Sequence, residues 1–145
     1  MADFTGEIKQ IPPRYSAVKV KGERAYKLAR EGIDFNLAER TIFVKTFLLS
    51  KRYDRDNIEF YMVCGKGGYI RSIARDLGQK LGCYGHIVSL RRTSVGPFKL
   101  KDCISLETLE TSSYSTNCDN YLLPLERGLS SMRKLEVGSK IASYI

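Results

Sequence analysis

The sequence predicts a fold that contains both β-strands and α-helices, because strand-like and helix-like patterns both occur along the chain. Two runs with strand chemistry, 41–49 and 57–64, are separated by the polar segment SKRYDRD, which predicts a β-hairpin. A helix is predicted directly after the second run, since apolar residues recur there at helical spacing: Ile70, Ile73, Ala74, Leu77 and Leu81. A chain of 145 residues is long enough for one such domain with a hydrophobic core.

The N-terminal segment predicts two short strands and one short helix. A strand is expected over 4–11, where a pair of prolines interrupts it. A second strand is expected over 15–20, with Gly22 ending it. The helix is expected over 23–31, with Gly32 as its C-terminal stop.

The junction between the second hairpin strand and the long helix carries the most distinctive side chains. After the glycine-rich turn 65–68, Tyr69 and Arg71 leave the sheet where the helix begins. A ring face, a guanidinium fork and the free N–H groups of a first helical turn suit a planar anionic ligand. The alternative is an ordinary turn with Tyr69 packed in the core. The glycine spacing is not that of a phosphate-binding loop.

The C-terminal part has a weaker pattern. A strand is expected over 90–95, ending at a Gly-Pro pair, and Ser105 can cap a short helix over 106–110. The polar stretch 111–120 predicts a loop or linker, and an apolar pattern returns over 121–137.

Basic side chains exceed acidic ones by 24 to 16, giving a formal net charge of +8. Such an excess favours a polyanionic partner, although a generically basic soluble protein has the same composition. Two tyrosines, Tyr15 and Tyr26, are interleaved with a basic cluster typical of a phosphate-tracking surface, or of a solvated helix face. The cluster consists of Arg14, Lys19, Lys21, Arg24, Lys27 and Arg30.

The four cysteines form no CxxC pair, and with one histidine, His86, they make no zinc constellation. We expect Cys64 to be a small buried hydrophobe and His86 to be structural. The sequence shows no signal peptide and no apolar run of membrane-spanning length. A reduced, cytoplasmic location is therefore expected.

Three ordered segments resemble the TruB family of tRNA pseudouridine synthases. The segment KGGYIRSIARDLGQKLG is similar to the family's KGTYIRSLARDLG-type signature, and the others are GEIKQIPPRYSAVKVKGERAYKLAREG and GHIVSLRRTSVGPF. Together they cover most of residues 4–100. Gly68 departs from the signature, because it stands where the family usually carries threonine.

The resemblance implies a pseudouridine synthase-like α+β fold with a mixed, largely antiparallel sheet and packed helices. It implies that 1–110 is the downstream part of the catalytic domain, 111–120 a linker or loop, and 121–145 the start of a truncated C-terminal RNA-binding region. The implied activity is isomerisation of the T-loop uridine (uridine-55) of tRNA to pseudouridine. The family needs no metal or organic cofactor for this reaction, and we expect the full-length protein to be a monomer.

The resemblance also implies roles for particular residues. Tyr69 matches the tyrosine that packs beside the flipped uracil and assists proton transfer, and Arg71 matches the arginine that positions the catalytic aspartate. Leu90 matches an apolar residue that lines the uridine pocket. The basic segment is expected to approach the tRNA stem-loop, and we assign its RNA contacts to Lys19, Lys21, Arg24 and Arg30.

The family's nucleophile is an aspartate in a GTLDPLATG-like loop, and this sequence contains no such loop. None of its aspartates stands in a similar context, and Asp76 is expected to pair on the helix surface with Lys80. We therefore expect the chain to be the downstream portion of a synthase and to be inactive alone. The alternatives are a noncatalytic RNA-binding module derived from the same family and a ribosome-associated basic protein without a pocket.

Overall fold

The structure, a computed structural model, describes residues 2–113 and 118–133. The chain divides into two compact units, Met1–Ser89 and Leu90–Ile145. The boundaries predicted at 110 and 120 separate a catalytic part, a linker and an RNA-binding region. They describe function and not compactness, so they stay predictions.

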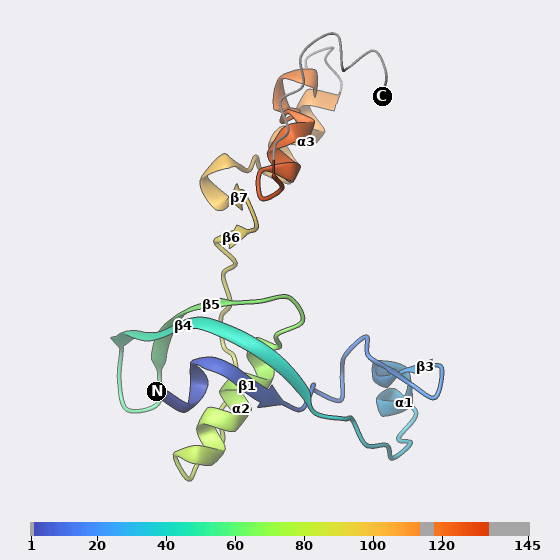
Figure 1. The fold of residues 1–145 in the computed structure, drawn as a ribbon, viewed down its shortest axis with the longest axis vertical. Coiled ribbons are helices and arrows are strands. Elements are labelled where there is room, and N and C mark those ends of the chain that lie inside the picture. Colours follow the sequence, from blue (N-terminus) through green and yellow to red (C-terminus); the bar gives the residue numbers. More distant parts are fainter. Residues whose placement is uncertain (1, 114–117, 134–145) are drawn as a thin grey trace. The chain divides into compact units, whose positions relative to one another are not determined.

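The first unit is built on a three-stranded antiparallel sheet of order β1-β4-β5 (Figure 1). The strands are β1 (Gly6–Gln10), β4 (Arg40–Arg52) and β5 (Ile58–Cys64), and a 3-10 turn, η1 (Ala2–Phe4), precedes them. The predicted hairpin is confirmed as β4 and β5, which pair through to Val44 opposite Cys64.

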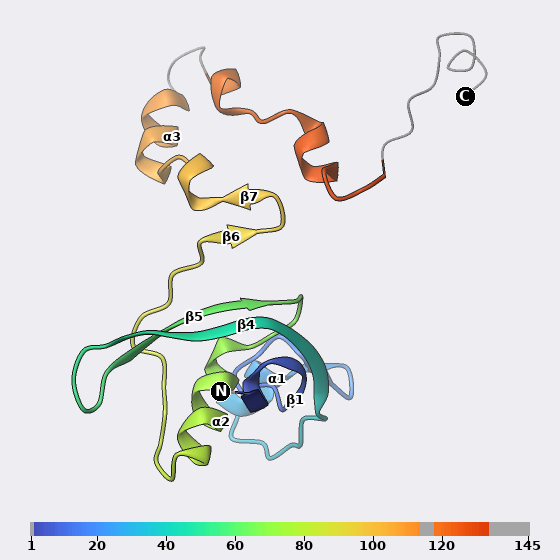
Figure 2. The ribbon, with the colours of Figure 1, turned by 60° about the vertical axis from the view of Figure 1, so that its left-hand side comes forward.

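The helix α2 (Ile70–Lys80) lies along one face of this sheet (Figures 1 and 2). Its Ile73 is buried with Ile42 and Val44 of β4, and Phe47 stacks on Phe60 at 4.7 Å between ring centroids. The helix is confirmed, but its apolar stripe is shorter than predicted, because Leu81 follows the last helical residue and is 65% exposed.

A small subdomain precedes β4 and consists of β2 (Lys19–Val20), β3 (Glu23–Arg24) and α1 (Ala25–Arg30). The strand predicted over 15–20 is wrong for its first four residues. There the backbone is held by tertiary contacts instead, since the carbonyl of Ser16 accepts the amide of Tyr26 at 3.0 Å. The short helix begins two residues later than predicted, because Glu23 and Arg24 pair with β2.

The second unit contains a minimal hairpin, β6 (Ser94–Val95) and β7 (Phe98–Lys99), followed by η2 (Leu100–Asp102) and α3 (Leu106–Ser113). Two further 3-10 turns are η3 (Cys118–Tyr121) and η4 (Leu125–Leu129). The strand predicted over 90–95 is therefore limited to its last two residues.

Ser105 caps α3 as predicted, because its Oγ accepts the amide of Thr108 at 3.0 Å. The helix continues past its predicted end at residue 110. The hydroxyls of Thr111 and Ser112 donate to carbonyls one turn earlier, at 2.8 and 2.7 Å, so the polar residues do not break the helix. The predicted apolar segment 121–137 lies partly outside the described residues.

Every strand pair within the described residues is antiparallel, and helices accompany the strands in both units. The predicted α+β class is confirmed. Among these residues, no helix has the length and apolar character needed to cross a membrane.

Candidate functional site

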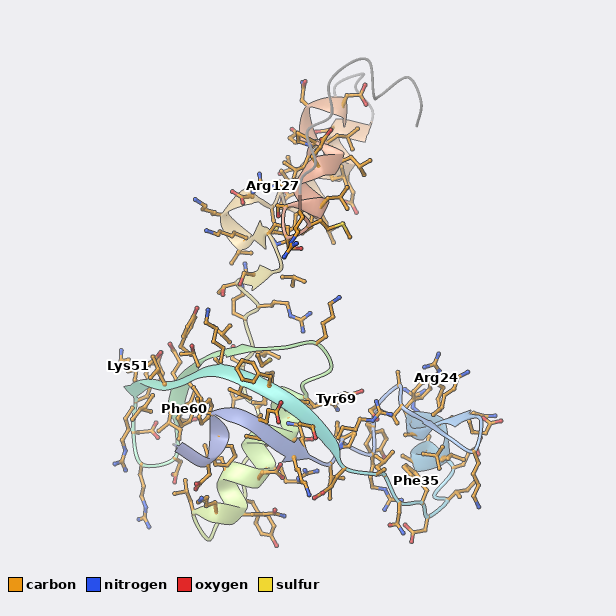
Figure 3. All side chains as sticks on the ribbon, viewed as in Figure 1. Arg24, Phe35, Lys51, Phe60, Tyr69 and Arg127 are labelled. Atoms are coloured by element: carbon orange, nitrogen blue, oxygen red, sulfur yellow. The ribbon has the colours of Figure 1, made fainter. Side chains whose placement is uncertain are left out.

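Tyr69 stands at the point where the turn after β5 becomes α2 (Figure 3). Gly67 has a φ of +83°, a conformation that suits glycine, and so turns the chain back toward the sheet. Tyr69 itself is extended (φ −102°, ψ 108°) and is the N-cap residue of the helix. Its carbonyl accepts the amides of Ser72 and Ile73 at 3.0 and 3.2 Å. The tyrosine is half-buried, so part of it remains available to a ligand.

Five hydrogen bonds, which we call the α2 clasp, join residues 10–15 to residues 69–75. In two of them, the Gln10 side chain contacts the backbone of Tyr69: Nε2 donates to the Tyr69 carbonyl at 3.0 Å, and Oε1 accepts the Tyr69 amide at 2.8 Å. Gln10 is only 2% exposed. The clasp therefore begins in the buried end of β1.

The other three bonds of the α2 clasp run from side chains of α2 to carbonyls beyond β1. The carbonyl of Ile11 accepts Ser72 Oγ at 2.8 Å and Arg75 Nη2 at 3.0 Å. The carbonyl of Tyr15 accepts Arg71 Nη2 at 2.9 Å. Because β1 ends at Gln10 and Pro12 cannot continue the ladder, the Ile11 carbonyl is outside the sheet and free to accept hydrogen bonds from the helix.

Arg71 is exposed, and within the described residues its guanidinium contacts no carboxylate. One amino group is used on Tyr15, which leaves most of its five N–H donors unused by these contacts. A carboxylate or phosphate could be bound bidentately by the remaining donors. Its implied pairing with a catalytic aspartate stays a prediction.

Leu90 is the first residue of the second unit, and its side chain is 59% exposed there. The structure places Tyr69 and Arg71 at the same helix start, as the N-cap residue and a first-turn residue of α2. The assignment of Leu90 to the uridine pocket stays a prediction.

The basic cluster is presented on a tight hairpin. Lys21 and Gly22 connect β2 to β3, and both have positive φ, +50° and +91°, as a two-residue type I′ turn requires. Lys19 lies directly opposite Arg24 in the register, so two like charges face each other across the hairpin. Such a pair is unfavourable unless an anion lies nearby.

The four predicted RNA-contacting residues differ in what already holds them (Figure 3 labels Arg24). Arg24 donates to the carbonyl of Ala17 at 2.6 Å, and the Arg30 guanidinium lies 5.6 Å from the ring centroid of Tyr26. Lys19 and Lys21 have no side-chain hydrogen bond or ion pair to any described residue. These two lysines are the side chains of the cluster most available to phosphate.

Lys27, in the same cluster, is already neutralised in part. Its Nζ donates to the Glu23 carboxylate at 3.0 Å, and this hydrogen bond, together with the charge of Glu23, raises the pKa of Lys27. Arg14 is likewise engaged, with Asp34 at 3.3 Å and with the ring of Phe35 at 4.9 Å. Neither side chain was assigned an RNA contact from the sequence.

Most aspartates of the chain are committed to local contacts. Asp76 pairs with Arg75 at 2.7 Å, and not with Lys80 as predicted, because the Lys80 ammonium pairs with Asp3. Asp54 accepts the amides of residues 56 and 57 at 2.8 and 2.7 Å in the β4–β5 turn. These hydrogen bonds lower the pKa of Asp54, and the largest contribution comes from the side chain of Asn57. The described residues contain no cluster of three or more histidine, cysteine or acidic side chains that could hold a metal ion.

Sequence reasoning identified Tyr69 and Arg71 but missed the other three side chains that make the α2 clasp. The side chains concerned are those of Gln10, Ser72 and Arg75. Each of them binds a residue about sixty positions away in the sequence, so no local pattern links the partners. One signal was present: Gln10 occupies the same strand face as Gly6 and Ile8, where an apolar residue is expected.

Two families match consecutive parts of this chain. The family described as "TruB family pseudouridylate synthase (N terminal domain)" matches residues 1–70. The family described as "tRNA pseudouridylate synthase B C-terminal domain" matches residues 71–130. The two matches are consecutive and together cover the elements that form the clasp.

Curated relatives carry the name tRNA pseudouridine synthase B. One from Ruegeria pomeroyi is 52% identical over 136 residues, which are 94% of this chain and 45% of the relative. Another, from Cereibacter sphaeroides, is 53% identical over 145 residues, which are 100% of this chain and 48% of the relative. The chain thus spans about half the length of the curated relatives it matches.

The fold has a counterpart among solved structures. A chain in the crystal structure of a Cbf5-Nop10-Gar1 complex superposes with a TM-score of 0.65 at 30% identity, covering 86% of this chain and 35% of that one. Sequence, family matches and fold all agree: the chain belongs to the TruB family of pseudouridine synthases.

Proposed function

We propose that this chain supplies part of the uridine pocket and of the RNA-binding surface of a tRNA pseudouridine synthase, which isomerises the T-loop uridine of tRNA. The observation that carries the proposal is the placement of Tyr69 and Arg71 at one helix start, held by the α2 clasp. The clasp leaves the Arg71 fork and part of Tyr69 available at the junction.

The reaction breaks a C–N glycosidic bond, turns the uracil and forms a C–C bond, and it needs the base outside its stack. In this proposal the Tyr69 ring packs beside the flipped uracil, while its hydroxyl assists proton transfer. Arg71 keeps the catalytic aspartate ionised and aimed at the sugar–base junction.

Lys19 and Lys21 support the RNA-binding part of the proposal. Their unpaired charges stand on a hairpin whose like-charged pair, Lys19 and Arg24, is stabilised when a phosphate lies between or near them. In this proposal the hairpin contacts the backbone of the T-arm stem-loop, the full-length protein works as a monomer, and it does so in the cytoplasm.

The catalytic proposal is tested by grafting. The region of the Ruegeria pomeroyi synthase that matches this chain is replaced by this chain. The grafted enzyme is incubated with unmodified tRNA, which is then analysed for pseudouridine. We expect product at the T-loop uridine, and Arg71→Ala in the graft should lose most turnover while keeping most tRNA affinity.

Two outcomes would contradict this proposal. A graft that binds tRNA normally but makes no pseudouridine, beside an active parent enzyme, would favour a noncatalytic RNA-binding module. If Arg71→Ala abolished tRNA binding and left turnover of bound tRNA intact, Arg71 would be a phosphate clamp.

The RNA-binding part is tested with the 145-residue chain itself. Replacing Lys19 and Lys21 by alanine should weaken tRNA binding, and should reduce the slope of log affinity against log salt by about 0.7–0.9 per lysine. The matched control replaces Lys45 and Lys51 of β4, which removes the same charge elsewhere. Equal losses in both pairs would show that net charge, and not the hairpin, determines binding.

A further inference from the structure

Gln10 occupies an unusual position at the end of β1. It lies on the same strand face as Gly6 and Ile8, and it is more deeply buried than either, with 2% exposure. A primary amide in such a place is unfavourable unless both of its polar atoms are paired. An apolar side chain of similar size would fill the site without that requirement.

Both polar atoms of Gln10 are used on a single residue 59 positions away. The amide and the carbonyl of Tyr69 are bound at 2.8 and 3.0 Å, as a neighbouring β-strand would bind them. With its amide and its carbonyl both fixed, the backbone of Tyr69 has little freedom to rotate. The direction in which the tyrosine side chain leaves the backbone is fixed with it.

The start of α2 is anchored without Gln10. Ser72 and Arg75 bind the carbonyl of Ile11, and Arg71 binds that of Tyr15. These three bonds hold the helix against the segment that follows β1. The Tyr69 carbonyl is also held by the amides of Ser72 and Ile73, so Gln10 adds one thing that these contacts and the rest of the α2 clasp do not supply. It binds the Tyr69 amide and thereby fixes the backbone of the residue before the helix on both sides.

We propose that Gln10 is a positioning residue, which holds the backbone of Tyr69 so that the tyrosine ring meets the flipped uracil in the reactive geometry. This inference rests on the proposed function of Tyr69. Gln10 touches no substrate in this proposal and acts only through Tyr69.

The first measurement needs no activity. In the ¹⁵N-labelled 145-residue chain, hydrogen exchange of the Tyr69 amide is compared between wild type and Gln10→Leu. We expect faster exchange at Tyr69 in the variant, with the amides inside α2 unchanged. Ile8→Ala is the matched control, because it also removes core-facing atoms from β1, and isoleucine has no polar side-chain atom that could bind the Tyr69 backbone.

The second measurement is turnover in the grafted synthase. Gln10→Leu should lower kcat by about ten- to a hundred-fold, as expected for a small misplacement of a reacting group, with tRNA affinity within about twofold. Ile8→Ala should keep kcat at a temperature where both variants are folded. Gln10→Asn keeps the amide but is one methylene too short to span both bonds, so it should lose kcat as well.

If Gln10→Leu folds poorly, hydrogen exchange of Gln10→Asn keeps the proposal testable, because positioning predicts faster exchange at the Tyr69 amide while the amides inside α2 stay protected. A purely packing role predicts that leucine is tolerated and asparagine is not, whereas positioning predicts that both lose kcat. Unchanged Tyr69 exchange in Gln10→Leu, or equal kcat in Gln10→Leu and Ile8→Ala, would overturn the proposal. An inactive wild-type graft would instead overturn the proposed function, and the exchange result would still decide whether Gln10 holds Tyr69.

Discussion

Replacing Gly68 by threonine, the residue that the TruB signature usually carries there, tests how closely the turn before Tyr69 is packed. A Cβ at Gly68 would lie 3.3 Å from Cys64 Sγ and 3.4 Å from Ile42 Cδ1. The first distance is shorter than ordinary van der Waals contact and the second is at its lower limit, so the further side-chain atoms of threonine have little room beside Ile42, which is buried in the core. Backbone strain is not the cause, because Gly68 is not among the residues with positive φ.

The expected effect combines two terms. Overpacking a close-packed site costs about 1–3 kcal/mol, and replacing glycine at a compatible backbone position returns about 0.4–1 kcal/mol through the unfolded chain. Gly68→Thr should therefore lower the free energy of unfolding by about 1–2 kcal/mol. Gly65→Ala is the matched control in the same turn, since its Cβ would meet its nearest atom at 3.6 Å and should be tolerated.

Urea unfolding followed by circular dichroism measures both variants, with Cys64→Ala added to complete a double-mutant cycle. If the thiol is the obstacle, removing it should recover part of the loss, with a coupling energy of about 0.5–3 kcal/mol. Strict additivity of Gly68→Thr and Cys64→Ala would refute the reasoning, because the two side chains would then not compete for space. A stabilised Gly68→Thr variant would refute it as well.

Three further outcomes are expected. The 145-residue chain alone should form no pseudouridine in unmodified tRNA above a no-protein control, because none of its aspartates stands in the family's nucleophile motif; nucleoside analysis decides this. In the grafted synthase, Tyr69→Phe should keep tRNA affinity and lower turnover by about 10²-fold if the hydroxyl transfers a proton, whereas a small loss would leave stacking as its main role. The pKa of Asp54 is lowered from 3.8 in the folded chain, so its stabilising contribution is complete above that value and is lost as the pH falls through the folded pKa. The difference in urea midpoint between wild type and Asp54→Ala should accordingly be constant near neutral pH and shrink in acid.

The elements that sequence predicted well are those in which a long period-specific pattern and the packing agree. Along β5, Phe60, Met62 and Cys64 face the core as alternation requires, and Ile73 and Leu77 of α2 meet them from the helix. The position of Tyr69 and Arg71 at a helix start followed from the same strand, turn and helix pattern.

The elements that sequence predicted poorly are those whose backbone is fixed from outside. Residues 15–18 alternate like a strand, but their carbonyls bind Arg71, Tyr26 and Ala25 instead of a neighbouring strand. Local periodicity cannot anticipate such partners, because each of them depends on how the subdomain and α2 fold against the segment. The hydrogen-bonding role of Gln10 was hidden for the same reason.

The contact between Arg71 and Tyr15 bears on how one arginine can serve both structure and chemistry. A guanidinium is planar and rigid, so fixing one amino group on a carbonyl at 2.9 Å also restricts where its remaining donors point. An ammonium in the same place could turn freely about its single bond and would offer no second, oriented edge. In the proposed function, the carbonyl of Tyr15 thus need not compete with the catalytic carboxylate for Arg71. By holding one edge of the fork, it reduces the conformational freedom that would be lost when the other edge binds a carboxylate.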